Sequence, residues 1–295
     1  MHTIEIPDLK LKKHFPEDLS ECNAQQYIDI SALLFQMQSG KLSIEAFKVN
    51  ALYILLNLKK TKTHKAIQEE KFANIWQVAQ TLDSFFETID EAKVLKTYYI
   101  NNPIAYISNG LKRWYGPTDE FQNIKTGEYI DGLSHYADFI ETGEIDYLYR
   151  LMATFYRRPK PFLWWKKTLD SYDNDPRKPY NSENVGRIAD KLKYYPIGVI
   201  YGFYLLFASF QKYISTARLY IEGKEIDLSI LFMPPKNQSA KPELPSLGMR
   251  SIINTMAESQ IFGPLEKVRE TSLYEILLRM YDISIKSANA EPTNT

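Results

Sequence analysis

Apolar residues recur at steps of three and four along much of the chain, which is the spacing of one face of an α-helix. After Asn23, a residue type that favours helix N-termini, the apolar positions run from Tyr27 to Met37 at this spacing. Gly40 then interrupts the pattern, and a second helix is predicted from Ser43 to Leu58. The two helices would form a helical hairpin that is closed by a short glycine turn.

The same arrangement recurs later in the chain. Tyr27-Ile28-Asp29 matches Tyr129-Ile130-Asp131, and Gly40 and Gly143 follow at comparable distances. Internal repetition is typical of a supersecondary unit that buries one face against a neighbour. We therefore expect duplicated helical-hairpin modules of similar shape in residues 20–58 and 124–157.

The remaining pattern predicts further helices and a few short strands. A third helix is expected over residues 66–89, and two short β segments, 94–100 and 104–107, are expected around the turn Asn101-Asn102-Pro103. Residues 3–11 alternate around Pro7, so they form an edge strand at best, or an extended arm that could lie on a partner. The predicted fold class is mainly α, with a few short β-strands.

Composition divides the chain into three ranges. Residues 170–184 are almost all polar or turn-forming, which indicates a surface loop and an internal boundary. We expect an N-terminal region, 1–97, with the arm, the first hairpin and the third helix. The second region, 98–169, would hold the β segments and the second hairpin. The third, 170–295, would be helical at 250–259 and 272–286, with a proline-rich arm at 232–247.

Residues 194–211 carry no charge, so they raise the question of a membrane span. The length is marginal for a span, which needs about 20 mainly apolar residues. Four tyrosines, Pro196 and two glycines dilute its hydrophobicity, so we expect a helix inside the fold and no contact with membrane. Gly198 and Gly202 would let another helix approach closely in either setting.

Charge and cysteine content restrict the possible partners and compartment. Thirty-six basic residues balance thirty-six acidic ones, so no overall field attracts nucleic acid or an anionic membrane. The single cysteine, Cys22, cannot form an intramolecular disulfide, and the first residues lack the apolar core of a secretory signal. Cytosolic synthesis is therefore expected. The twenty-one tyrosines favour half-buried helix faces and protein interfaces.

Catalytic signatures are not evident in the sequence. Common motifs for nucleotide binding, zinc proteolysis and α/β-hydrolase chemistry do not occur, so we expect neither an enzyme nor a cofactor. Glu128, Asp131 and His135 could share one helical face and hold a divalent metal, but further ligands are not apparent. An ordinary solvated helix face explains the same pattern, and metal-dependent catalysis stays the weakest alternative.

A basic and aromatic segment is the best candidate for binding. Arg157, Arg158, Lys166 and Lys167 surround Trp164 and Trp165. Single-stranded nucleic acid and membrane headgroups can use this combination, but tryptophan and arginine are also the commonest anchors of protein interfaces. We expect a protein interface here, with the N-terminal arm and the extended segment around Pro234 and Pro235 as further contact surfaces.

Three stretches carry a resemblance to known proteins. They are F-P-E-D-L-S-E-C-N-A-Q-Q-Y-I-D-I, then G-P-T-D-E-F-Q-N-I-K-T-G-E-Y-I-D with L-M-A-T-F-Y-R-R-P, and near the end I-F-G-P-L-E-K-V-R-E-T-S-L-Y-E-I-L. The chain resembles poorly characterised phage and prophage proteins of Bacteroidetes that belong to tail and virion gene clusters. The resemblance implies a structural or tail-assembly role without catalysis, with other virion or tail proteins as partners and possible homo-oligomers. Such a protein would act in the host cytoplasm during assembly and could remain in the virion. The alternative is a membrane-associated protein anchored by residues 194–211.

Overall fold

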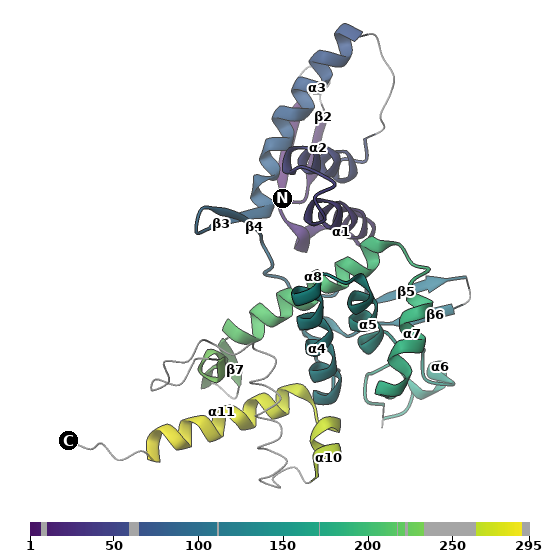
Figure 1. The fold of residues 1–295 in the computed structure, drawn as a ribbon, viewed down its shortest axis with the longest axis vertical. Coiled ribbons are helices and arrows are strands. Elements are labelled where there is room, and N and C mark those ends of the chain that lie inside the picture. The colour runs from purple at the N-terminus through teal and green to yellow at the C-terminus, as the bar shows by residue number, and fades with distance from the viewer. Residues whose placement is uncertain are drawn as a thin grey trace, which may run out of the picture. The chain divides into compact units, whose positions relative to one another are not determined.

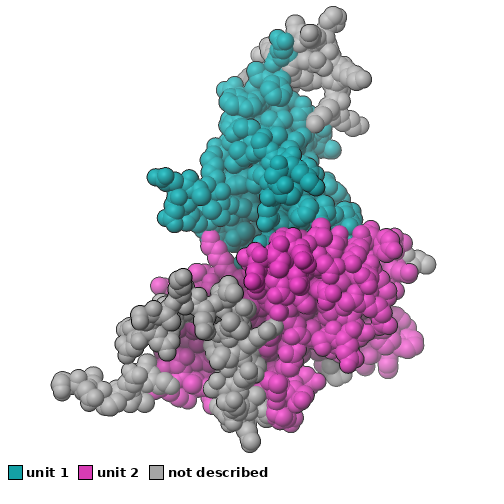
Figure 2. Space-filling view, viewed as in Figure 1, with its two compact units in different colours: residues 1–104, 195–209 teal, residues 105–194, 210–295 magenta. Residues whose placement is uncertain are grey.

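The computed structural model describes residues 1–6, 11–58, 65–110, 112–170, 172–216, 218–221, 224–232 and 264–290, in two compact units. Unit 1 comprises Met1–Ile104 and Tyr195–Ser209, and unit 2 comprises Ala105–Tyr194 and Phe210–Thr295. Figure 1 labels the elements, and Figure 2 colours the two units. Neither unit is continuous along the chain. They do not coincide with the three consecutive ranges expected from the sequence, and that three-part division stays a prediction.

Unit 1 is built around helices and two β-hairpins. In chain order its elements are β1 (His2–Ile6), β2 (Leu11–Phe15), the 3-10 helix η2 (Leu19–Glu21), α1 (Ala24–Gln38), α2 (Ile44–Leu55), α3 (Lys65–Ala79), the 3-10 helix η3 (Gln80–Phe85), β3 (Phe86–Ile89), β4 (Ala92–Leu95) and the first part of α8 (Ile197–Thr216). Strand β1 pairs antiparallel with β2, from His2 opposite Phe15 to Ile6 opposite Leu11. The N-terminal segment is therefore one strand of a hairpin.

The first helical hairpin forms where the sequence predicts it, because its caps satisfy the free backbone groups at the helix ends. The Asn23 side chain accepts from the Gln26 amide at 3.0 Å, and the Gln26 side chain accepts from the Asn23 amide at 3.1 Å. Ser43 caps α2 in the same way, accepting from the Ala46 amide. Gly40 adopts a positive φ of 70°, a conformation that glycine reaches without steric cost, and the chain turns back at this point.

Helix α8 provides the apolar centre of unit 1 and lies against α1. A Cβ on Gly198 would stand 2.1 Å from the carbonyl oxygen of Ile28, so the absence of a side chain permits this approach. The buried Tyr27 hydroxyl contacts the Gly202 carbonyl oxygen at 2.7 Å and the Tyr99 hydroxyl at 2.8 Å. Ser209 accepts from the Tyr99 amide at 2.9 Å. These bonds satisfy polar groups that would otherwise be costly among the apolar residues of α8.

Unit 2 contains the second helical hairpin. Its elements are β5 (Tyr106–Asn109), β6 (Lys112–Tyr115), η4 (Asp119–Phe121), α4 (Thr126–Thr142), α5 (Ile145–Phe155), α6 (Leu163–Lys166), η5 (Ser182–Asn184), α7 (Val185–Leu192), the rest of α8, β7 (Arg218–Ile221), β8 (Lys224–Asp227), η6 (Leu228–Phe232), α10 (Leu265–Glu270) and α11 (Leu273–Ala290). Strand β5 pairs antiparallel with β6, and β7 with β8.

Close packing between α4 and α5 depends on a small residue. A Cβ on Gly132 would stand 2.4 Å from the ring of Phe155, so only glycine leaves room for this aromatic side chain. Phe121 stacks on Phe210 of α8 at 4.2 Å between ring centroids and meets the Phe155 ring edge to face. The buried Tyr129 hydroxyl donates to the Gln211 side chain of α8 at 2.7 Å. The core of unit 2 therefore joins the hairpin to the end of α8.

The predicted fold class is confirmed as mainly α with short strands, and both predicted segments contain a helical hairpin. Gly143 ends α4 with a φ of 70°, as Gly40 does between α1 and α2. The connections differ, because residues 39–43 separate the first pair of helices and only Gly143 and Glu144 separate the second. That the hairpins are duplicated modules stays a prediction.

Several predicted boundaries are wrong. The third α-helix ends at Ala79 instead of residue 89, and the apolar residues that prolong its pattern form η3 and the strand β3. The expected β segments 94–100 and 104–107 are not strands over these lengths, because β4 ends at Leu95 and Ile107 belongs to β5. Helix α11 confirms the prediction for 272–286. The proline-rich arm beyond Phe232 and the helix predicted at 250–259 lie outside the described residues.

Helix α8 is the apolar segment that raised the membrane question. By length and composition it could cross a membrane, and it is the one such helix in the described part of the chain. Buried positions make up 67% of its most apolar stretch. The core helix of a soluble protein has the same properties, so this observation is weak evidence for a span.

We predict that Gly198→Ala lowers the free energy of unfolding by about 1–3 kcal/mol, because the added methyl group would overlap a backbone carbonyl that cannot rotate away. Gly186→Ala is the matched control, since a Cβ there meets no heavy atom within 4 Å. The control should leave stability unchanged or slightly raise it. Urea unfolding of both variants checks this, and equal midpoints would show that α1 and α8 do not approach as closely as described.

Candidate interaction surface

A buried ionic cluster fixes the segment that follows the second hairpin. The cluster consists of Glu128 on α4, Arg157 just after α5, and Arg177 and Asp175. The last two belong to residues 170–184, which we call the polar loop. Arg177 is fully buried, and Glu128 and Arg157 are 1% and 4% exposed. Arg157 Nη2 donates to Glu128 Oε1 at 2.7 Å, and Arg177 Nη1 lies 3.4 Å from Glu128 Oε2. Buried charges persist only when they are paired, so these residues hold α4 and the loop together.

The two guanidinium groups also donate to backbone carbonyls and to the Asp175 carboxylate. Arg157 Nε donates to the Lys178 carbonyl at 2.7 Å, and Arg177 Nη2 donates to the Asn123 carbonyl at 2.7 Å. Asp175 accepts from Arg177 Nε at 2.8 Å. Burial, followed by the like charge of Arg177, lowers the pKa of Arg157. The polar loop is therefore anchored from inside, which corrects the prediction that residues 170–184 are only a surface loop.

Backbone hydrogen bonds fix both ends of the segment that carries α6. Tyr115 and Arg157 exchange two bonds, of 2.9 Å and 3.0 Å, so residue 157 pairs with strand β6. On the other side, the Lys178 amide donates to the Arg158 carbonyl at 2.9 Å, and the Lys160 amide donates to the Pro176 carbonyl at 2.8 Å. Residues 157–160 therefore lie between β6 and residues 176–178. The intervening segment projects from a fixed base.

Helix α6 exposes large aromatic side chains at the surface of this segment. It is one turn long and follows Phe162, whose φ of 53° turns the chain after Pro161. Phe162, Trp164 and Trp165 are 71%, 77% and 54% exposed. Large apolar side chains that cluster in the open mark an interaction site more often than isolated ones do. We call Phe162, Trp164, Trp165, Lys166 and Lys167 the tryptophan surface.

Positively charged side chains lie within the tryptophan surface and beside it. Lys166 and Lys167 form no ion pair within the part of the chain that the structure describes. Lys160, by contrast, binds Asp173 at 2.7 Å, so its charge is compensated. Arg158 lies over the Trp114 ring, 5.3 Å from its centroid. The free lysines would favour an acidic partner.

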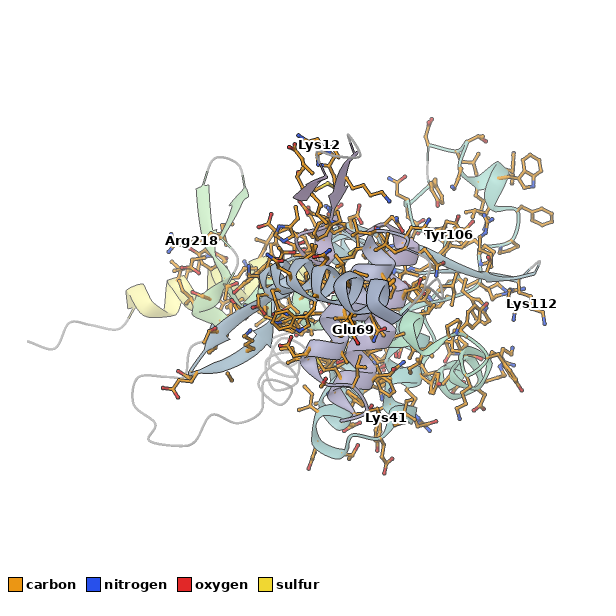
Figure 3. The ribbon with its side chains drawn as sticks, turned by 90° about the horizontal axis from the view of Figure 1, so that it is seen from above. Lys12, Lys41, Glu69, Tyr106, Lys112 and Arg218 are labelled. Atoms are coloured by element: carbon orange, nitrogen blue, oxygen red, sulfur yellow. The ribbon has the colours of Figure 1, made fainter. Side chains whose placement is uncertain are left out.

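The neighbouring β5–β6 hairpin adds basic and aromatic residues. Tyr106 and Lys112, both labelled in Figure 3, belong to its two strands. Arg113 lies over the Tyr106 ring at 4.8 Å, an arrangement that orders an exposed arginine. Without the residues of the buried ionic cluster, residues 105–115 and 157–178 hold seven basic and two acidic residues, a net charge of +5. Because the whole chain is neutral, this positive charge is local.

The predicted binding residues fall into three groups. Trp164, Trp165, Lys166 and Lys167 lie together on the tryptophan surface, although Lys166 is only half exposed. Arg157 is buried in the ionic cluster, so its prediction as an interface residue is wrong, and Arg158 is half-buried beside Trp114. Pro234 and Pro235 lie outside the described residues.

The predicted metal candidates do not form a site together. Glu128 faces two arginines, whereas Asp131 accepts from Arg269 at 2.6 Å and from Tyr180 at 2.7 Å. His135 lies half-buried on the same helix. Among the described residues, no group of three His, Cys, Asp or Glu side chains could hold a metal ion. Helical spacing brings the three residues near one another, but Glu128 and Asp131 already bond to other side chains.

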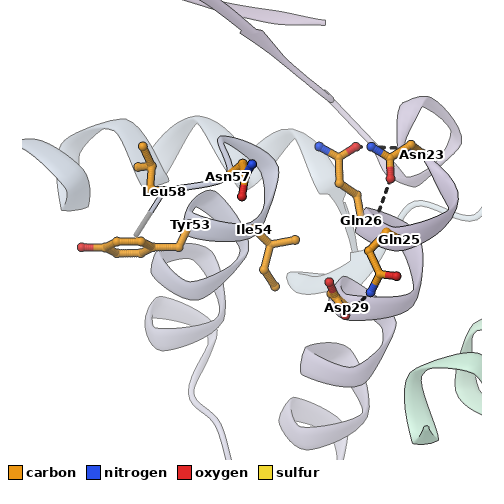
Figure 4. A pocket seen from close by; sticks show the side chains of 8 residues that line it. All are labelled: Asn23, Gln25, Gln26, Asp29, Tyr53, Ile54, Asn57 and Leu58. Atoms are coloured by element: carbon orange, nitrogen blue, oxygen red, sulfur yellow. Dashed lines mark hydrogen bonds between the residues drawn. The ribbon is translucent and has the colours of Figure 1, made fainter. Parts of the chain in front are cut away.

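An open depression lies in unit 1 between the start of α1 and the end of α2 (Figure 4). Its volume is about 470 Å³, and polar side chains such as Asn23, Gln25 and Asp29 line much of it. The Asn23 and Gln26 side chains are already used in the helix cap, and Gln25 donates to Asp29 at 3.0 Å. These groups are therefore occupied with one another, and the depression is a weaker candidate than the tryptophan surface.

Sequence reasoning missed Arg177, because it treated the surrounding loop as solvated. A buried carboxylate needs a cation, but the burial of Glu128 on α4 is visible only in the structure. No family model, curated protein or solved structure matches the chain.

We predict that Glu128→Gln lowers the free energy of unfolding by about 3–5 kcal/mol, because two arginines would remain buried without their shared carboxylate. Glu141→Gln is the matched control on the same helix, and its side chain is exposed. Urea unfolding should show a large shift for the first variant and almost none for the second. Similar shifts would contradict the role assigned to the cluster.

Proposed function

We propose that the chain is a structural or assembly protein that acts by binding another protein and performs no catalysis. The observation that carries this proposal is the exposure of Trp164 and Trp165 side by side, at 77% and 54%. Tryptophan is among the residues that contribute most to protein interfaces, and an uncovered pair supplies anchor area with a lysine rim. A protein partner would cover this apolar area.

The fixed base of the tryptophan surface supports the same proposal. Backbone bonds at residues 157–160 and 176–178 hold the segment in place before any partner arrives. A binding surface that is already ordered loses less conformational entropy on association. The arrangement therefore suits stable assembly.

A role in a phage virion or tail is the specific form of this proposal. It rests on the sequence resemblance to phage and prophage proteins of Bacteroidetes, and the mainly α fold with an exposed aromatic surface is compatible with it. The partners would be other virion or tail proteins, with copies of the chain itself as a further partner. The site of action would be the host cytoplasm during assembly, with the virion as a second location.

We predict that Trp164→Ala with Trp165→Ala leaves the far-ultraviolet circular dichroism spectrum nearly unchanged, because both side chains are largely exposed. The same double variant should weaken binding to the partner by at least about 2 kcal/mol, or roughly 30-fold in Kd. Quantitative affinity purification with products of the neighbouring genes identifies the partner, and titration with that protein measures the loss.

Trp76→Ala is the matched control, since Trp76 is 47% exposed on α3 in unit 1. It should bind the partner as the unaltered protein does. Unfolding of the Trp164/Trp165 variant would show that these side chains belong to the core. Normal binding by a folded variant would place the interface elsewhere.

Membrane association through α8 is the second candidate, because this helix passes the length and composition test for a span. We predict that the protein is recovered without detergent, since the Tyr27 hydroxyl and the Gly202 carbonyl already bond inside the fold. Fractionation followed by a carbonate wash decides between the two. Recovery only in the washed membrane pellet would favour the membrane candidate.

A further inference from the structure

We infer that a second copy of this chain docks on the tryptophan surface through the turn between α4 and α5. This inference rests on the proposed function and specifies one partner for it. The turn carries apolar area and negative charge, and the tryptophan surface carries apolar area and positive charge. Both belong to unit 2.

The turn is acidic and partly apolar at its surface. Residues 138–146 contain four acidic residues and no basic one. Ile140 and Ile145 are 58% and 40% exposed, although aliphatic side chains of this size are usually buried. Glu141 and Glu144, beside them, are also exposed. We call Ile140, Glu141, Glu144 and Ile145 the acidic turn.

The acidic turn has charges available for a partner. Asp146 is already paired with Arg150 at 2.8 Å and with Lys193 at 3.0 Å. Glu141 and Glu144 form no ion pair within the described ranges, as is also true of Lys166 and Lys167. Docking would bring two unpaired glutamates to two unpaired lysines and cover exposed isoleucine and tryptophan side chains. Complementary charge around an apolar centre is the usual arrangement of a specific interface.

The two surfaces lie beyond opposite ends of helix α5. The acidic turn lies at the start of α5, whose first residue is Ile145, and the segment with α6 follows the last residue, Phe155. Eleven helical residues span about 16 Å, so the two surfaces are separated on one molecule. A contact between unlike surfaces is heterologous, and it generates a ring or an open filament according to the rotation between copies. The expected assembly is therefore head to tail.

An acidic protein surface fits better than nucleic acid. The chain carries its own complementary surface, where exposed glutamates lie beside Ile140 and Ile145, whereas the neutral total charge provides no long-range attraction for a polyanion. The experiment below therefore also tests for binding of nucleic acid.

Charge exchange on the purified full chain tests the inference. Lys166→Glu with Lys167→Glu makes the tryptophan surface acidic, and Glu141→Lys with Glu144→Lys makes the turn basic. Sedimentation velocity over a range of concentrations should show association of the unaltered protein that weakens as salt rises. Each double variant alone should associate at least about 10-fold more weakly, because like charges then face each other.

Mixing the two variants provides the decisive result. In the mixture the acidic tryptophan surface of one variant can dock on the basic turn of the other. The unaltered turn of the first can likewise dock on the unaltered tryptophan surface of the second, so association should return. Lys41→Glu with Lys191→Glu is the matched control for the lysine variant, because these exposed lysines lie outside both surfaces and the net charge changes by the same amount. This control should associate like the unaltered protein.

Several outcomes would overturn the inference. They are a monomer at all concentrations, no recovery on mixing, an equal loss in the control, or tight binding of a labelled single-stranded oligonucleotide that depends on Lys166 and Lys167. A monomer whose Trp164 and Trp165 are still needed to bind a different protein would refute self-docking and leave the proposed function intact. Loss of neither self-association nor partner binding on replacing both tryptophans would refute both.

Discussion

The shared carboxylate of Glu128 is the interaction on which the arrangement of the candidate surface depends. It compensates two buried guanidinium groups, Arg157 and Arg177, that arrive from different segments. Guanidinium groups keep their proton in proteins, so without Glu128 their positive charge would lie buried with only Asp175 to offset it, which is strongly unfavourable. Because one arginine follows α5 and the other lies in the polar loop, the cluster fixes both ends of the segment that carries α6. The exposed tryptophans are therefore presented on a base that is held from inside the unit.

Tyrosine hydroxyls provide a second set of constraints. Tyr27 on α1 bonds the Gly202 carbonyl of α8, and Tyr129 on α4 bonds Gln211 of the same helix. Each hydroxyl is buried and needs a partner, so these bonds select one orientation of each hairpin against its part of α8. Burial raises the pKa of Tyr129 far above its ordinary value, and the phenol stays neutral at physiological pH. The unusual tyrosine content of the chain therefore serves packing as well as surface area.

The charged side chains on unit 2 are of two kinds: those with a local partner of opposite charge, and those without one in the described residues. Asp146, Lys160 and Asp131 have local partners of opposite charge, whereas Lys166, Lys167, Glu141 and Glu144 have none in the described residues. The available charges border exposed apolar side chains at two places. Exposed ion pairs contribute little to the stability of a monomer, but charges that border an apolar contact steer association and set its register. This distribution is consistent with the proposed assembly function.

The sequence by itself determined the local elements. Helical spacing, Asn23 and Ser43 as caps, and glycines at residues 40 and 143 are local signals, so both helical hairpins and the mainly α class could be predicted. The tryptophan surface could also be located, because Trp164, Trp165 and the two following lysines are adjacent in the chain.

Tertiary structure decided which polar residues are buried and which apolar ones are not. Arg157 and Lys166 look alike in sequence, yet one is enclosed with Glu128 and the other has no acidic partner in the described residues, because only the path of the loop through Arg177 brings the cluster together. The end of α3 also could not be read from periodicity. Phe86–Ile89 continues the apolar pattern, but it pairs with Ala92–Leu95 as a strand. Ile140 and Ile145 follow the helical pattern of buried residues but lie exposed beside the turn. Periodicity records only which face a residue occupies, whereas burial and pairing depend on what packs against that face.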